Sequence, residues 1–335
     1  MEGLVREPWV AISPLLCLAL VACGGGSDPH AGQEPLTVHF DALVNGQPFS
    51  CSGAYMMGTP PALARPSHFR MFVYDIAATS AGGDSARLTL DESEWQGNFD
   101  DVGHNVALLD FDDATGNCRY TDADTHTVVT GWVTNTTTLT GLTFRIGIPS
   151  ELDHLDAGLA PPPLNRPGLW SGWQLGSILL RADFDTANND SHRPQTKDDE
   201  LTPGGWQFWL ADAGTGPQAC TGEPNLGYQC ANQFQPKVLL DPFDPAQDHV
   251  GLDLGALLQD VDMDRTAFDM APVGRDPAIT DPTITTYPMP DYRAGCFMDR
   301  VDGECAVTLR RLGIDWVTLA PPDATTQDFA VKVGP

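Results

Sequence analysis

The segment spanning residues 36–43 reads Leu36-Thr37-Val38-His39-Phe40-Asp41-Ala42-Leu43, and it decides the fold. Apolar and polar side chains alternate along it, which is typical of a strand that buries one face. The pair Asn45-Gly46 follows at once and is a strong signal for a tight hairpin turn. The segment therefore predicts a β-strand that packs one side against a core and then reverses.

Alternation of the same kind recurs along most of the chain. It predicts further strands at residues 70–76, 86–90, 106–111, 125–133, 142–148, 176–184, 206–210 and 237–240. We expect the strands at 125–133 and 142–148 to be neighbours, and the apolar strand at 176–184 to be central. One helix is expected at 252–262, where four apolar residues form a stripe. These elements predict a mainly β fold, an antiparallel β-sandwich-like single domain with long loops and one or two short helices.

The composition agrees with a turn-rich, acidic protein. The chain has 33 Gly and 28 Pro, which favour many turns and short strands. Its 18 Lys and Arg face 45 Asp and Glu, and the resulting net charge of −27 disfavours binding to nucleic acid or to anionic lipid. Two polar stretches, near 186–202 and 272–293, are expected to be loop insertions.

The N-terminus predicts export and lipid attachment. Residues 1–22 contain a short apolar stretch followed by small residues, as in a secretory signal peptide. Leu20-Val21-Ala22-Cys23 matches the bacterial lipobox, so Cys23 is expected to carry the lipid and begin a flexible tether at 23–34. A domain at 35–335 would follow the tether. Gly24 after the lipidated cysteine favours sorting to the outer membrane. The body of the protein is expected in the periplasm or at the cell surface. The alternative is a secreted protein cut near Cys23; no later stretch is long enough to span a bilayer, so the lipid is the expected membrane contact.

Six cysteines remain once Cys17 is removed with the signal and Cys23 takes the lipid. An even number in an exported protein predicts three disulfides, although six cysteines allow about 15 pairings. Local closure is expected within the two close pairs, and the long-range pair then remains. The expected bonds are Cys220–Cys230, Cys296–Cys305 and Cys51–Cys118. Thiolate metal ligation is the alternative, but the chain has no CxxC pair and the expected compartment is oxidising.

The sequence carries no motif of a known enzyme class, so we expect a binding protein and not an enzyme. Asp260, Asp262 and Asp264 have the spacing that begins an EF-hand loop. Arg265 and Ala271 stand where that loop needs Gly and Glu, so a solvated helix end is expected there. A Ca²⁺ site in such acidic loops remains the alternative.

Histidine and tryptophan gather in the middle of the chain. His154 follows a predicted strand and precedes three prolines, and loops of this kind commonly carry sites. Trp170 and Trp173 come soon after it, although aromatic packing in the core is the ordinary interpretation of such residues. His39 lies on the first strand, where a packed or edge histidine is the default. Imidazole with a thioether is the ligand set that suits Cu(I).

Several phrases, in order, resemble one family, the MbnP-like copper-binding proteins, also called metallo-mystery-pair four-Cys-motif proteins. The phrases are Val44-Asn45-Gly46-Gln47-Pro48-Phe49-Ser50-Cys51, Trp95-Gln96, Val106-Ala107-Leu108-Leu109-Asp110-Phe111, Gly116-Asn117-Cys118, Gly141-Leu142-Thr143-Phe144-Arg145-Ile146-Gly147-Ile148-Pro149, Asp153-His154, Ala160-Pro161-Pro162-Pro163-Leu164-Asn165, Trp173-Gln174, the pair Cys220 and Cys230, Gly295-Cys296 with Met298, and Cys305. The series extends over residues 37 to about 315, most of the expected mature chain.

The resemblance implies a β-rich envelope protein that binds one copper ion, as Cu(I), in copper homeostasis. It also implies a partner, a dihaem protein of the cytochrome c peroxidase/MauG type, which oxidises the first Trp of a WxW motif to kynurenine. His154 falls on the family's ligand histidine, and Met298 stands one residue later than its methionine. Here the motif is Trp-Ser-Gly-Trp, which makes Trp170 or Trp173 the modified residue. His39 is a further candidate ligand.

Two other functions stay open. A divergent member without metal would act as a surface binding or adhesion module, with Trp170, Trp173, Trp206 and Trp209 as packing or ligand-stacking aromatics. A Ca²⁺-stabilised surface domain would rest on the acidic loops alone and would melt at a higher temperature when Ca²⁺ is added.

Overall fold

The computed structural model describes residues 30–118, 123–134, 139–172, 176–189, 205–211, 220–223, 227–230, 235–265, 294–297, 303–314 and 327–334. The expected signal peptide at 1–22, Cys23 and the insertion at 272–293 lie outside these residues. The insertion at 186–202 is described only as far as residue 189.

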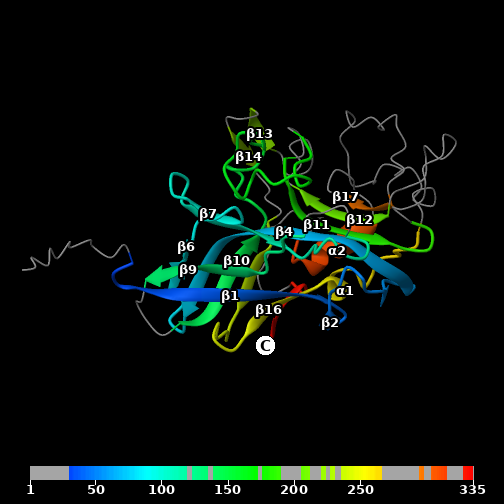
Figure 1. Ribbon diagram of the computed structural model, residues 1–335, viewed down its shortest axis with the longest axis horizontal. Coiled ribbons are helices and arrows are strands. Elements are labelled where there is room, and N and C mark those ends of the chain that lie inside the picture. The colour runs from blue at the N-terminus through cyan, green and yellow to red at the C-terminus, as the bar shows by residue number, and fades with distance from the viewer. Residues whose placement is uncertain are drawn as a thin grey trace, which may run out of the picture. The chain divides into compact units, whose positions relative to one another are not determined.

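One sheet is built around β1 (Gln33–Val44), the long strand in the lower part of Figure 1. Its strand order is β18 (Ala330–Val333), β16 (His249–Asp253), β1, β9 (Val128–Thr134) and β6 (Thr89–Leu90), with β2 (Gln47–Pro48) paired to β1. Asn45 and Gly46 both have positive φ, 52° and 73°, in the turn between β1 and β2. The predicted strand and its hairpin turn are therefore confirmed.

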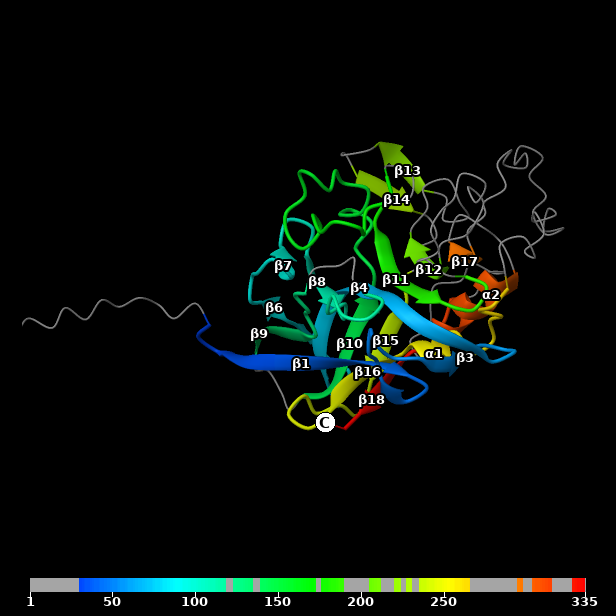
Figure 2. The ribbon, with the colours of Figure 1, turned by 45° about the vertical axis from the view of Figure 1, so that its right-hand side comes forward.

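The second, ten-stranded sheet is built around β4 (Ala62–Ser80), which extends across the molecule in Figures 1 and 2. Its main order is β15 (Lys237–Leu240), β10 (Leu139–Ile146), β4, β11 (Ile178–Asp185), β12 (Trp206–Ala211) and β17 (Ala294–Phe297). The strands β3 (Tyr55–Met57), β5 (Ser85–Arg87) and β8 (His104–Asp110) also pair with β4, and β7 (Gln96–Phe99) pairs with β8. β11 has neighbours on both sides, which confirms its predicted central place.

Three small elements complete the described chain. The strands β13 (Cys220–Glu223) and β14 (Gly227–Cys230) form a separate hairpin, at the top of Figure 1 and far from β1. The helices are α1 (Leu254–Leu257) and α2 (Gly303–Arg311), in agreement with the expected one or two short helices. Within the described residues, neither helix has the length or the apolar content needed to cross a membrane.

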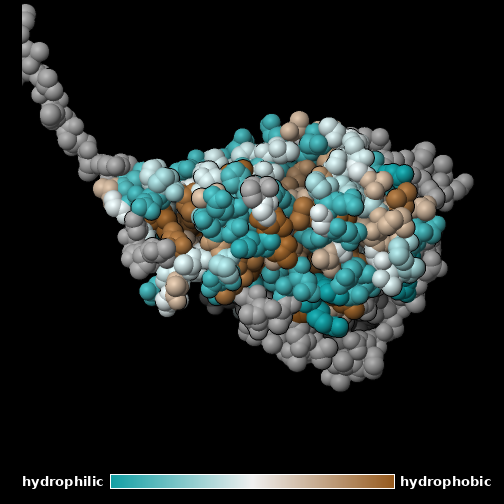
Figure 3. Space-filling view, turned by 90° about the horizontal axis from the view of Figure 1, so that it is seen from below, coloured by the Kyte–Doolittle hydropathy of each residue, from teal (hydrophilic) through white to brown (hydrophobic). Residues whose placement is uncertain are grey.

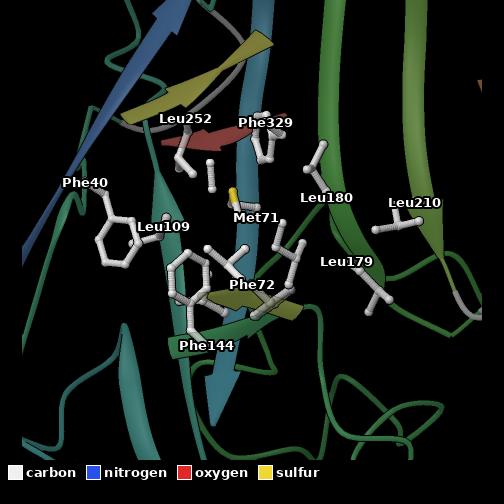
Figure 4. Close-up of a cluster of buried hydrophobic side chains, with 14 of the residues drawn as sticks. Phe40, Met71, Phe72, Leu109, Phe144, Leu179, Leu180, Leu210, Leu252 and Phe329 are labelled. Atoms are coloured by element: carbon white, nitrogen blue, oxygen red, sulfur yellow. The ribbon is translucent and has the colours of Figure 1, made fainter. Parts of the chain in front are cut away.

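The core lies between the two sheets, as in a β-sandwich. Phe40 of β1 meets Phe144 of β10 edge to face, with ring centroids 5.6 Å apart. Phe69 of β4 lies against Phe329, which precedes β18, at 6.3 Å. Figure 4 shows Phe40 and Leu252 of the six-stranded sheet (the small sheet), with Phe329 just before β18, gathered around Met71 and Phe72 of β4. The predicted mainly β, sandwich-like class is confirmed.

The expected pairing of the strands at 125–133 and 142–148 is wrong. β9 pairs with β1 and β6, whereas β10 pairs with β4 and β15 in the other sheet. Each strand finds a longer partner in its own sheet, because β1 has 12 residues and β4 has 19. The expected strand at 86–90 is likewise divided, because β5 pairs with β4 and β6 pairs with β9.

The expected helix at 252–262 is also wrong in extent, and the sheets are mixed instead of wholly antiparallel. Residues 252 and 253 belong to β16, which pairs in parallel with β1. The Asp253 carboxylate caps the backbone N–H groups of Gly255 and Ala256, so α1 begins only at Leu254 and has four residues. β12 and β17 form the second parallel pair. The four apolar residues of the predicted stripe, Leu254, Leu257, Leu258 and Val261, are all buried, but Leu258 and Val261 lie in the turn that follows α1.

Candidate metal centre

His154 lies in a tight loop that leaves the end of β10. The loop closes through two backbone bonds to the carbonyl of Pro149, from the N–H of Leu152 at 2.9 Å and that of Asp153 at 3.0 Å. His154 itself has φ +62°, a left-handed conformation that is uncommon outside glycine and asparagine. Its side chain is buried, with 1% exposed. The chain therefore turns sharply at this histidine and directs it inward.

The Asp153 carboxylate is wholly buried beside the imidazole. Its Oδ1 accepts the backbone N–H of His154 at 2.9 Å and that of Ser177 at 2.7 Å. Its Oδ2 has no hydrogen-bond partner among the described residues and lies 3.7 Å from Nε2 of His154. Burial raises the pKa of Asp153 from 3.8 to about 7, and the bonds from Ser177 and His154 lower it by less. This carboxylate ties the histidine loop to the segment at residue 177.

The segment held by Asp153 carries the first tryptophan of the Trp-Ser-Gly-Trp motif. Trp170 forms a β-bridge with Ser177, and the N–H of Ile178 donates to the carbonyl of Leu169 at 2.6 Å. The half-buried Trp170 therefore lies on one arm of a loop whose other arm bonds to Asp153. Residues 173–175, which include Trp173, lie outside the described residues.

Gly176 permits the close approach of the two loops. It has φ +63°, and a Cβ added there would lie 2.5 Å from Oδ1 of Asp153. Both the backbone conformation and the space therefore require glycine.

The other predicted ligands are placed differently. His39 lies on the outward face of β1 and stacks on His249 of β16, with ring centroids 4.7 Å apart. Met298, the predicted thioether ligand, lies outside the described residues. The structure thus brings His154 together with the Trp170 loop, while His39 belongs to the other sheet.

Two of the three expected disulfides are present in the described part of the chain. Cys51 bonds to Cys118 with S–S 2.06 Å, and Cys296 bonds to Cys305 with S–S 2.14 Å. The backbones of Cys220 and Cys230 lie opposite each other in the β13–β14 hairpin, and their side chains lie outside the description. Among the described His, Cys, Asp and Glu residues, one group of three could reach a common ion: Cys51, Cys118 and Asp112. Its two sulfurs form the disulfide, which excludes thiolate ligation there.

The acidic loop at 260–264 is engaged in protein contacts. Arg311 donates to the Asp260 carboxylate from Nη2 at 2.7 Å and from Nε at 3.1 Å. Asn188 donates its backbone N–H to the Asp264 carboxylate at 2.8 Å. These two carboxylates therefore stabilise the fold locally, and neither is held open for a cation.

Sequence reasoning missed the role of Asp153 and an aromatic stack at Trp95. The Arg166 guanidinium lies 3.7 Å from the centroid of the Trp95 ring, and the His126 ring stacks on the same indole at 5.4 Å. Burial lowers the pKa of His126 and the nearby Arg166 charge lowers it too, while the hydrogen bond with the Leu108 carbonyl raises it. Asp153 could have been found from the sequence because it adjoins His154. The stack on Trp95 could not, because residues 95, 126 and 166 follow no regular spacing.

This chain is similar to proteins of a known family and of known structure. The model of the MbnP family matches residues 33–273. The solved structure of MbnP from Methylosinus trichosporium is similar, with TM-score 0.66 and 23% sequence identity, over 90% of this chain and 99% of that chain. At this identity the likeness shows the shared fold. No match was found among the curated proteins.

Proposed function

Because this chain belongs to the MbnP family, we propose that it is an envelope lipoprotein that binds a single copper ion, as Cu(I), in copper homeostasis. The observation that carries the proposal is the buried His154, held against the Trp170 loop by Asp153. We propose a binding function and no enzymatic one.

The proposed ligand pair, one histidine and one methionine, fits Cu(I). An imidazole is a suitable ligand for copper, and a methionine thioether completes the soft set that favours the reduced ion. His154 supplies the imidazole and Met298 is the proposed thioether. Oδ2 of Asp153 lies 3.7 Å from Nε2 of His154, so this carboxylate could orient the ring or balance the charge of a bound ion. Bound copper would be stored or passed on, with the burial of His154 limiting its exposure to water.

The neighbouring tryptophan gives the proposal its second part. We place the oxidation to kynurenine at Trp170, with Trp173 as the alternative, and a dihaem cytochrome c peroxidase/MauG-like protein as the oxidant. The modified side chain gains an amine and a carbonyl beside the His154 loop, where both groups can contact a bound ion's ligands. Lipid attachment at Cys23 would hold the domain in the periplasm or at the cell surface, where an exported partner can reach it.

Mass spectrometry of the protein co-expressed with the dihaem protein tests the proposal. We expect the peptide spanning residues 169–174 to gain about 4 Da, the change for loss of one carbon and gain of one oxygen. We also expect one copper per chain. Material made without the partner is the control, and Trp170→Phe and Trp173→Phe variants identify the modified indole. Unmodified tryptophans together with absent copper would contradict the proposal.

The structure gives less support to a surface adhesion function. Trp206 is wholly buried in the core. Trp209 donates its indole N–H to Asp183 at 2.9 Å, and the Arg181 guanidinium lies 5.1 Å from the centroid of its ring. Trp206 therefore offers no exposed ring, and the N–H and one face of the partly exposed Trp209 are engaged by Asp183 and Arg181.

A further inference from the structure

The outward face of the small sheet carries a pair of histidines from strands that are far apart in sequence. Phe40 points into the core against Phe144, so its neighbour His39 points to the opposite face of β1. The parallel register pairs Phe40 with Val250, which sets His39 beside His249. The two rings stack with centroids 4.7 Å apart and an interplanar angle of 17°. Both histidines are partly exposed on this face.

A carboxylate fixes one of the two rings. Asp41, two residues after His39 on the same face of β1, accepts from Nδ1 of His249 at 2.8 Å. With Nδ1 as the donor, the neutral ring presents the lone pair of Nε2. The His249 side chain is 23% exposed, so the ring is partly open to solvent. A carboxylate that orients a histidine through its second nitrogen is the usual support of a metal ligand.

The residues on either side of the pair are apolar. In the sheet register Val128 of β9 lies across from His39, and Val333 of β18 lies across from His249. Across β9, β1, β16 and β18 this row of the sheet therefore reads valine, histidine, histidine, valine, with the two polar residues in the middle. Figure 3, which views the molecule from below Figure 1, shows hydrophilic residues between separate hydrophobic patches.

We propose that His39 and His249, supported by Asp41, bind a divalent late first-row metal ion on this face, with Cu(II) bound most tightly. Imidazole ligands suit such ions, and Cu(II) heads their affinity order. Two imidazole nitrogens about 2.0–2.1 Å from one Cu(II), at adjacent corners of the square plane that this ion prefers, lie roughly 2.9 Å apart. The rings are stacked with centroids 4.7 Å apart, so binding requires both rings to turn their Nε2 edges toward the ion. The site has only nitrogen and oxygen donors, so it is distinct from the proposed Cu(I) site and does not depend on it.

Titration of the full mature chain with Cu(II) alone, followed by electron paramagnetic resonance, tests the proposal. At one equivalent we expect couplings to two imidazole nitrogens. His39→Gln and His249→Gln should each weaken binding by at least about tenfold and remove one coupling. Asp41→Asn should weaken it by roughly tenfold to a hundredfold, the range for a lost supporting carboxylate.

His104→Gln is the matched control. His104 donates to Asp75 at 2.7 Å, as His249 does to Asp41, but its described ring contact is with Tyr74. This variant should keep the Cu(II) affinity and the spectrum, and so should His154→Asn, which separates this site from the Cu(I) site. Unchanged affinity and couplings in His39→Gln and His249→Gln would overturn the proposal. So would fewer than two imidazole couplings in the unmodified protein, a measurement that does not depend on how the variants fold.

Discussion

Replacing Gly176 with alanine should separate the histidine loop from the tryptophan loop. Gly176 joins the arm that carries Ser177 to the Asp153 carboxylate, which in turn binds the backbone of His154. The substitution adds only one methyl group, and it adds it at the contact between the two loops. Its effect therefore measures how firmly that contact is specified.

The magnitude follows from two contributions. An alanine at φ +63° costs about 1–2 kcal/mol because of the left-handed backbone conformation. The new Cβ would lie 2.5 Å from Oδ1 and 2.8 Å from Cγ of Asp153, so the carboxylate must move. Loss of one of its two charge-assisted hydrogen bonds costs about 1.5–3 kcal/mol. We expect a total loss of about 2.5–5 kcal/mol, a large part of the roughly 5–15 kcal/mol that stabilises a typical domain.

Urea unfolding at pH 8, where Asp153 is ionised, gives the free energy of unfolding. Gly168→Ala is the matched control, because Gly168 has φ +80° and its nearest neighbour to an added Cβ is Arg181 Nη1 at 4.0 Å. That variant should lose only the backbone contribution. The reasoning is refuted if the two variants lose the same stability, since the contact with Asp153 would then contribute nothing.

Two further perturbations test the stability of the fold. Burial raises the pKa of Asp110 from 3.8 to about 7, so its contribution to stability is complete below pH 3.8 and is lost as the pH rises to about 7. Asp110→Asn should remove that part of the decline, which has a limiting slope of about 1.4 kcal/mol per pH unit in unfolding free energy, and an unaltered slope would contradict the assignment. Opening Cys51–Cys118, whose residues are 67 apart, should cost about 4 kcal/mol, against about 2.5 kcal/mol for Cys296–Cys305, whose residues are 9 apart. Serine pairs and calorimetry measure both losses; an equal or reversed order would count against the loop-closure explanation.

Alternation in the sequence predicted the strands better than their partners. The pattern at residues 36–43 fixed which side of β1 faces the core, because Leu36, Val38 and Phe40 are buried. It could not predict that β9 joins β1 while β10 joins β4, because the same short connection suits either arrangement. Pro66 also masked the length of β4, since proline inside a strand usually marks an end or an edge.

The sequence predicted residues of the candidate site, but not the hydrogen bonds that hold its two loops together. His154 and Trp170 were chosen from their neighbours in sequence, and the structure brings their loops together. The contact runs through Asp153 and Ser177, which are 24 residues apart. No periodic pattern encodes it, because both residues lie in irregular loops. No pattern in the sequence links His249 to His39, and the parallel register of β1 and β16 is what brings their rings together.

A competition titration with Cu(I) under reducing conditions tests the central claim most directly. The His154→Asn variant and the wild-type chain are each co-expressed with the dihaem partner and compared. Asparagine accepts the left-handed backbone that His154 adopts, so the variant removes the imidazole and keeps the loop. We predict one tightly bound Cu(I) per wild-type chain and none in His154→Asn. An equally tight single Cu(I) in His154→Asn would contradict the account.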